Sequence, residues 1–180
     1  MTKLPTYTRL FGWTREILDS ARSELADVRL AIAIVEHARA DLGLGQTTGN
    51  NRGPELERYG VGQGQAWCAA AAWSWISWAH ASLGIQWAVP STMGAKRLYR
   101  DTVRHGAAVE LGRLRIADLL CWDRGEEGDW RGHVAIVSEV HGPGEVTAVH
   151  GNSGPRVRER RHRLADERRF IGAARATVGR

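Results

Sequence analysis

The sequence contains two cysteines, and their surroundings differ. Cys68 stands in "GQAWCAAAAWSW", where a stretch rich in Gly and Gln runs into four alanines. Because alanine strongly favours helix, Cys68 is predicted at a helix N-terminus, where free backbone N–H groups stabilise a thiolate. For this residue alone, a buried structural thiol is an equal alternative. Cys121 lies in the apolar segment "LLCW" and is interpreted as a core residue.

A nucleophilic thiol needs a base, and His133 is the best placed of the seven histidines. It opens the apolar segment "HVAIVSEV" directly after a polar loop. If the loop "HGPG" allows Val140 to pair with Glu145, His133 lies opposite Asn152 on one face of a hairpin. The Asn152 side chain would then bond one ring nitrogen of His133 and leave the other for a thiol. His150 is predicted on the same face, diagonal to His133.

Each of these residues also has an ordinary explanation, since a histidine can simply close a strand and Asn favours turns. Their occurrence together predicts a Cys–His–Asn site formed by Cys68, His133 and Asn152. The backbone N–H of Cys68 and the side chain of Gln65 are the expected oxyanion donors. The candidate walls of a substrate groove, each with a core position as its alternative, are Trp67, Trp87 and Trp130.

Helical patterns that would position the cysteine come first in the chain. Residues 14–42 are predicted as one helix with a buried apolar face. That face consists of Leu25, Val28, Ile32, Val35 and Leu42. Residues 45–66 are predicted as a long loop, because they are rich in Gly, Asn, Gln and Thr. The remaining helical segments are a single turn from Pro54 to near Gly60 and two helices over residues 69–82 and 93–104.

Strand patterns that would position the histidines follow the helices. They cover residues 117–123, 133–140, 145–152, 156–164 and 170–176. Helices followed by strands predict an α+β domain, with N-terminal helices packed on a C-terminal antiparallel sheet of about five to six strands. Residues 1–22 are predicted as a partly helical extension and residues 23–180 as one domain.

Composition excludes several classes of protein. The chain has 180 residues, a net charge of +5 and 43% hydrophobic residues, as expected of one globular domain. It has no apolar run long enough to cross a membrane, no secretory signal, no zinc motif and no nucleotide-binding loop. The basic run "RVRERRHRLADERR" favours a solvated strand pair over an anion-binding patch, so no nucleic-acid partner is expected. We expect no metal, no cofactor and a monomer.

The segments "WCAAAAWSWI", "GHVAIV" and "VHGNSG" together resemble the CHAP family of cysteine, histidine-dependent amidohydrolases/peptidases, in particular its phage and actinobacterial members. The resemblance covers residues 24–176. Ile116 and Ala117 stand where the family usually has Pro and Gly, whereas Asp118 is retained. His150 stands where many members have Glu, two residues before Asn152.

The resemblance implies a papain-like fold and hydrolysis of amide bonds in peptidoglycan. It also implies that Cys68 is the nucleophile, His133 the general base and Asn152 an orienting residue, with His150 as a further candidate for orienting His133. Calcium-binding relatives carry an Asp-x-Asp cluster before the cysteine. The corresponding loop here has only Glu55 and Glu57, so no calcium is expected.

A cell-wall hydrolase without a signal peptide would be made in the cytoplasm and reach the wall by holin-type release or a secretion machine. A phage lysin or a delivered antibacterial effector fits this expectation, with an immunity or delivery protein as its expected partner. Two alternatives stay open. One is a cysteine hydrolase acting on an amide outside peptidoglycan, and the other is a non-catalytic wall-binding module that keeps the fold.

Overall fold

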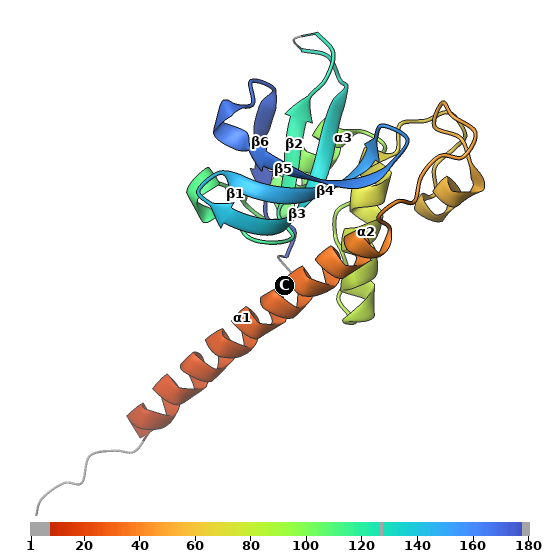
Figure 1. The fold of residues 1–180 in the computed structure, drawn as a ribbon. Helices are drawn as coiled ribbons and strands as arrows, with labels where there is room; N and C mark the ends of the chain where they lie inside the picture. The colour runs from red at the N-terminus through yellow and green to blue at the C-terminus, as the bar shows by residue number, and fades with distance from the viewer. Residues whose placement is uncertain (1–7, 127, 178–180) are drawn as a thin grey trace, which may run out of the picture.

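The computed structural model describes residues 8–126 and 128–177 and has the predicted α+β architecture (Figure 1). The α-helices are α1 (Thr8–Ala40), α2 (Cys68–Ser82) and α3 (Ala95–His105). Three short 3-10 helices are η1 (Pro54–Tyr59), η2 (Leu111–Arg113) and η3 (Leu164–Asp166). The turn at Pro54 and the two later helices are therefore confirmed within two residues, whereas α1 begins at Thr8 and not at residue 14. The first seven residues of the predicted N-terminal extension lie outside the described residues.

One six-stranded antiparallel sheet follows the helices, in the order β1-β6-β2-β3-β4-β5. The strands are β1 (Ala108–Val109), β2 (Leu119–Asp123), β3 (Gly132–Gly142), β4 (Glu145–Ser153), β5 (Arg156–Arg163) and β6 (Phe170–Ala174). The five predicted strands are all present. The additional strand β1 has only two residues, which is too short to show an alternating pattern.

The two faces of the sheet belong to two apolar clusters. Strand residues such as Leu119, Val134 and Ile136 join the larger cluster, which includes the helices. Their neighbours Leu120 and Ala135 point the other way into the smaller cluster. Helix α2 packs against α1 on one side and β3 and β4 on the other, and its run of alanines permits this close packing.

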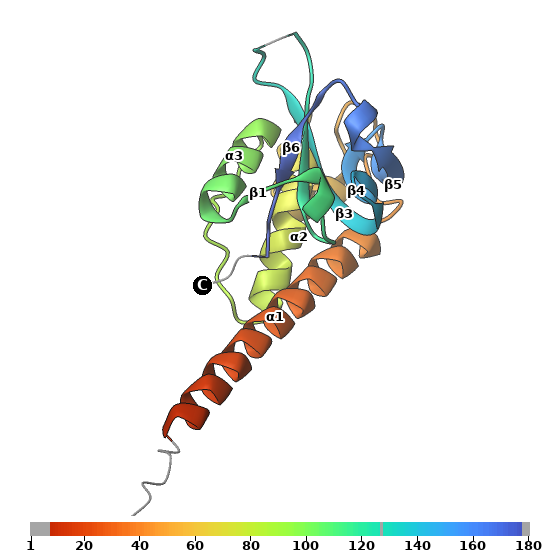
Figure 2. The same cartoon turned by 90° about the vertical axis from the view of Figure 1, so that its left-hand side faces the viewer.

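Helix α1 is longer than predicted and buries a different face. It begins at Thr8, and its N-terminal part extends beyond the domain in both views (Figures 1 and 2). The residues that pack on the domain are Leu30, Ala31, Ile34, Val35 and Ala38. Of the predicted face only Val35 is buried, while Leu25, Val28, Ile32 and Leu42 are exposed. The sequence pattern revealed an apolar stripe, but it could not reveal that a second stripe faces the domain.

The end of α1 is anchored by Asp41, which is 2% exposed. Its carboxylate accepts hydrogen bonds from the Tyr59 hydroxyl at 2.6 Å and from the Trp75 indole at 2.7 Å. Arg58 completes the group with an ion pair at 2.9 Å. A buried carboxylate needs such partners, and these ones join α1 to η1 and α2. No helix in the described part of the chain has the length and apolar character of a membrane span.

The loop between β3 and β4 is tighter than predicted. Gly142, not Val140, pairs with Glu145, so the loop is reduced to two residues. The second of these, Gly144, has φ 71°, as two-residue hairpin turns often require. Two irregularities in β3 then absorb the extra residues.

Beyond these irregularities the strands recover the predicted offset. Ile136 pairs with Val149, and Val137 pairs with Ala148. The prediction was therefore wrong at the loop and correct at Ile136 and Val137, whereas the predicted pair of His133 with Asn152 is not part of this ladder.

The segment before β2 contains the residues that depart from the family pattern. Ala117, which stands where the family usually has Gly, adopts the left-handed φ of 70°. The next residue, Asp118, is fully buried, accepts the Arg115 backbone N–H at 2.8 Å and pairs with Arg175 at 3.0 Å. Burial nevertheless raises the pKa of Asp118 to about 6.

Candidate active site

Cys68 is the first residue of α2, as predicted, and it is 3% exposed. Burial raises the pKa of its thiol. The nearby Arg124 cation and the backbone N–H groups of Val134 and Ala69 act in the opposite direction and favour the thiolate. No side chain caps this helix end, so its first N–H groups stay available to an anion.

Gly151 brings the sheet close to this helix end. A Cβ atom on Gly151 would lie 2.8 Å from Cβ of Ala71 and 3.5 Å from Cα of Cys68. Only glycine permits such an approach without displacing α2. The absence of a side chain at position 151 therefore sets the separation between the thiol and the histidine-bearing strands.

His133 is the second residue of β3 and precedes Val134, whose backbone N–H acts on the Cys68 thiol. Its ring is buried, and burial, together with the charge of Arg124, lowers its pKa to about 3. The two ring nitrogens have different surroundings. Nδ1 is buried and has no hydrogen-bond partner in the described part of the chain, whereas Nε2 lies 2.9 Å from Nδ1 of His150. Nδ1 is thus the nitrogen available to a thiol.

His150 occupies the place that was predicted for Asn152. The rings of His133 and His150 stack with their centroids 5.1 Å apart. Asn152 has a left-handed φ of 55°, and the pairing of β4 with β5 shifts between His150 and Ser153. Such a bulge redirects side chains, so Asn152 does not continue the regular alternation that the prediction assumed.

The hydrogen bonds continue past His150 to a carboxylate. Nε2 of His150 lies 2.8 Å from Nε2 of His162, and Nδ1 of His162 lies 2.7 Å from an oxygen of Glu167. The other oxygen of Glu167 accepts a hydrogen bond from the Trp122 indole. We call His133, His150, His162 and Glu167 the histidine chain.

Trp122 forms one wall of the histidine chain. Its ring centroid lies 6.0, 5.5 and 5.1 Å from those of His133, His150 and His162. The histidine chain runs from the interior towards the surface, because the side chains of His162 and Glu167 are 12% and 32% exposed.

Counting hydrogen-bond donors and acceptors shows which ring nitrogens carry protons when the three histidines of the histidine chain are neutral. An ionised Glu167 only accepts, so Nδ1 of His162 must carry a proton. His162 therefore has no proton on Nε2 and accepts a hydrogen bond there from Nε2–H of His150. His150 in turn has no proton on Nδ1 and accepts a hydrogen bond there from Nε2–H of His133. Neutral His133 is left with no proton on Nδ1, and this nitrogen can accept one from a thiol.

The other predicted site residues are scattered. Trp67 is completely buried and stacks on Tyr59 at 5.8 Å, so its assignment to a groove wall was wrong. Trp87 is half-buried beside His80, with ring centroids 4.7 Å apart. Gln65 is exposed, and its side-chain oxygen lies near Gly62.

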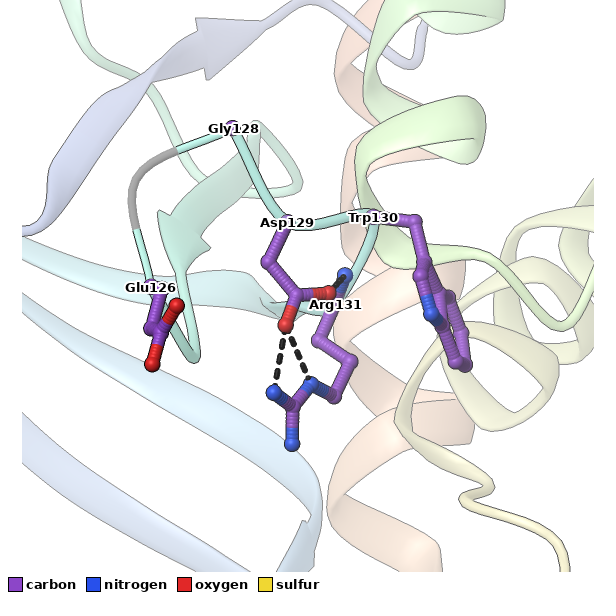
Figure 3. Close-up of a pocket in the computed structure, with 5 residues that line it drawn as sticks. All are labelled: Glu126, Gly128, Asp129, Trp130 and Arg131. Atoms are coloured by element: carbon purple, nitrogen blue, oxygen red, sulfur yellow. Dashed lines mark hydrogen bonds and ion pairs between the residues drawn. The ribbon is translucent and has the colours of Figure 1, made fainter.

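Trp130 is the tryptophan best placed to meet a ligand, since it is 75% exposed. It lies in the loop that leads into β3, where a hollow is lined by Glu126, Gly128, Asp129, Trp130 and Arg131 (Figure 3). Asp129 and Arg131 pair with each other in this loop. A second hollow on the other side of Trp130 is lined by Lys96, Arg97 and Arg100 of α3, among others. Within the described residues, no cluster of acidic, His and Cys side chains could hold a metal ion.

Sequence reasoning missed His162, Glu167 and Arg124. His162 lies in a strand rich in arginine, which was interpreted as solvated surface. The register of the second hairpin gives only a weak signal: it places His162, opposite Val146, on the same face of the sheet as His150 but four residue pairs away from it. Arg124 and Glu167 lie outside the strands, and only the folded chain brings them to the site.

Comparison with known families gives one match. The model of the CHAP domain matches residues 60–152, which is more than half of the chain. The matched segment contains Cys68, His133 and His150 and ends before His162 and Glu167. A search of curated proteins found no match.

Proposed function

The chain belongs to the CHAP family of cysteine amidohydrolases/peptidases, and from this premise we propose that it hydrolyses an amide bond of peptidoglycan. The observation that carries the proposal is the arrangement of Cys68 and His133. The backbone N–H of Val134 acts on the buried thiol at the start of α2, and the residue before it, His133, carries a neutral imidazole whose Nδ1 has no hydrogen-bond partner among the described residues. This is the minimum required for nucleophilic catalysis by cysteine.

In the first step, Sγ of Cys68 attacks the amide carbonyl while its proton passes to Nδ1 of His133. The backbone N–H of Cys68 donates to the developing oxyanion, with the Gln65 side chain as the proposed second donor. The proton on His133 then passes to the departing amine, and a thioester remains. Water attacks the thioester, giving a proton to His133 as it does so, and the acid leaves with regeneration of the thiol.

His150 is the proposed orienting residue, in place of the Asn152 expected from sequence. Its contact with Nε2 holds the ring of His133 and keeps Nδ1 free of a proton. A carboxylate at this position, as in many family members, would accept the same hydrogen bond. The family pattern and this variation of it therefore lead to the same tautomer of His133.

The surface beside Trp130 is the proposed substrate-binding side. Its indole offers a flat apolar face to a sugar or a peptide. Three basic residues, Lys96, Arg97 and Arg100, and one acidic residue, Asp129, line the neighbouring hollow, and this excess of positive charge suits the carboxylates of peptidoglycan stem peptides. A phage lysin or a delivered effector remains the proposed context for this activity.

Digestion of purified sacculi tests the proposal. The wild-type chain should release soluble fragments with new amine ends, and mass analysis of the fragments identifies the bond. The Cys68→Ala variant should release none, whereas Cys121→Ala is the matched control and should behave as wild type. Equal release by wild type and Cys68→Ala would contradict the proposal.

A further inference from the structure

We propose that His162 and Glu167 are positioning residues of the active site, which set the tautomer of His133 and take up the positive charge that forms during the reaction. This inference rests on the proposed function. It concerns residues outside the segment that matches the family and is carried by the continuous hydrogen bonds of the histidine chain.

The interior around His133 is a poor place for a cation. His133 and His150 are 6% and 3% exposed, and neither has a carboxylate among its hydrogen-bond partners in the described residues. The groups whose positive charge acts on His133 from the neighbouring loop and strand are Arg124, His162 and Arg160, and each disfavours an imidazolium there. Yet catalysis requires His133 to accept a proton from the thiol.

The histidine chain removes this difficulty by moving the charge. When Nδ1 of His133 receives the thiol proton, the proton on its Nε2 can pass to His150. His150 then passes its own Nε2 proton to His162. One proton has left Cys68 and one has been gained by His162, so the charge lies beside the Glu167 carboxylate and closer to water. A cation at that position has an anionic partner at 2.7 Å.

Glu167→Gln is the sharpest variant, because it keeps the shape of the side chain and can still accept from Trp122. Its amide can also donate to Nδ1 of His162, which reverses every hydrogen bond and places a proton on Nδ1 of His133. Glu159→Gln is a matched control, since Glu159 lies in the same strand as His162 but on its other face, where it pairs with Arg39.

Two measurements separate this inference from the proposed function. The first is the rate of alkylation of Cys68 by iodoacetamide across a range of pH, which needs no peptidoglycan. Glu167→Gln should slow alkylation at neutral pH and move its midpoint to higher pH, whereas Glu159→Gln should match wild type. The second is kcat on sacculus fragments, which should fall by about tenfold to a hundredfold with KM unchanged.

Unchanged alkylation and turnover in Glu167→Gln would overturn the inference. Failure of the wild type to digest sacculi, with the alkylation shift still present, would overturn only the proposed substrate. If Glu167→Gln does not fold, nitrogen-15 NMR of the wild-type histidines replaces it. A proton on Nδ1 of neutral His133 would then contradict the proposed tautomer.

A separate observation carries a second inference: we propose that α1 pairs in parallel with α1 of a second copy of the chain. Leu18, Leu25 and Ile32 are seven residues apart and are 55%, 60% and 44% exposed. Ala21 and Val28 fall between them at alternating spacings of three and four residues. We call these five residues the outer stripe. This spacing is that of a two-stranded coiled coil.

The domain leaves Leu18, Leu25 and Ile32 of the outer stripe free for a second helix. It packs on Leu30, Ile34 and Ala38, which lie on a different side of α1. Val28, at one edge of the outer stripe, lines a hollow that it shares with Arg115 and Arg175 of the domain. Residues 15–29 are exposed on every side, although helices owe most of their stability to packing. A second helix on the outer stripe would supply that packing.

Charge favours a parallel arrangement. Glu24 and Arg29 flank the outer stripe on opposite sides, at the positions that face each other across a parallel pair. In an antiparallel pair Arg22 and Arg29 would instead face the same residues of the partner and repel them. The monomer expected from sequence is therefore replaced in this proposal by a dimer.

Light scattering on the full chain tests the pairing. Wild type should have twice the chain mass of 19.9 kDa. Leu25→Glu should have the mass of one chain and still digest sacculi, whereas Ser23→Glu, on another side of the helix, should stay a dimer. A disulfide formed by Ala21→Cys would support the parallel arrangement, and its absence in a dimer would contradict it. A wild-type monomer or trimer would overturn the inference.

Discussion

The histidine chain and the outer stripe of α1 both depart from the usual burial of apolar residues and exposure of polar ones, and they do so in opposite directions. In the first, polar rings are buried in the domain. In the second, large apolar side chains face water. The buried rings have hydrogen-bond partners within the same protein molecule, so the histidine chain needs no second molecule to satisfy it. The apolar stripe has no partner within the described chain, so its burial requires another molecule.

This difference separates chemistry from assembly. Residues of the histidine chain should affect catalysis without changing oligomeric state, and residues of the outer stripe should do the reverse. Asp41 and its partners hold the end of α1 to η1 and α2. The predictions below test whether the two regions are in fact independent.

The largest effect is expected at His150. His150→Leu removes the partner of His133 Nε2 and breaks the histidine chain, so kcat should fall by about a hundredfold to a thousandfold. His150→Glu should retain more activity, because a carboxylate can accept the hydrogen bond from His133. Both variants should remain dimers by light scattering. A His150→Leu enzyme with wild-type kcat would remove His150 from the mechanism.

Substitutions at two residues of α1 should distinguish folding of the protomer from formation of the dimer. Leu30 is 1% exposed and faces the domain, whereas Ile32 is 44% exposed and belongs to the outer stripe. Leu30→Ala should lower the free energy of unfolding by about 2–5 kcal/mol because it leaves a cavity. Ile32→Ala should change the unfolding of the protomer little and weaken the dimer, as followed by light scattering on dilution. Equal effects on folding would show that the outer stripe is part of the core.

Acid should destabilise the histidine region. Burial lowers the pKa of His133, His150 and His80, so the unfolded chain takes up protons that the folded chain does not. Stability should be fully present above about pH 6.5 and be lost as pH falls below it towards 3. The loss should reach about 1.4 kcal/mol per pH unit for each histidine that stays neutral.

Urea unfolding at pH 7 and pH 5 measures this loss. Leu25→Glu should show the same difference between the two pH values as wild type, because the outer stripe contains no histidine. A stability that stays constant down to pH 5 would contradict the buried neutral state of these rings.

The smallest effect is expected from the charges beside the outer stripe. Arg29→Glu should weaken the dimer by about 0.5 kcal/mol for each pair that it breaks. The reversed pair, Arg29→Glu with Glu24→Arg, should restore the wild-type dissociation constant in sedimentation equilibrium. Failure of the double variant to recover would argue against a parallel arrangement.

Local signals in the sequence were sufficient to place Cys68 and His133. A Gly- and Gln-rich loop that enters an alanine run predicts a helix start, and an apolar run after a polar loop predicts a strand start. The role of Asn152 could not be predicted, because it depends on a bulge and a left-handed φ that strand alternation does not reveal. His162 and Glu167 required the placement of a third strand and the segment after it.

The outer stripe shows a different limit of sequence patterns. Helical spacing correctly identified Leu25, Val28 and Ile32 as one apolar face, yet an apolar face can meet its own domain or another molecule. Leu30 and Ile34 form the competing face, and only the position of the domain decides between them. Periodicity identifies surfaces that need burial, and the folded structure identifies what buries them.

Gly151 has a consequence for how freely this site can vary. Because even a methyl group there would meet Ala71 and the backbone of Cys68, every substitution at position 151 must move the nucleophile relative to its base. A population of variants under selection for activity should therefore lose nearly all changes at this residue, although it takes no part in the chemistry. In a deep mutational scan, position 151 should be as intolerant as position 68.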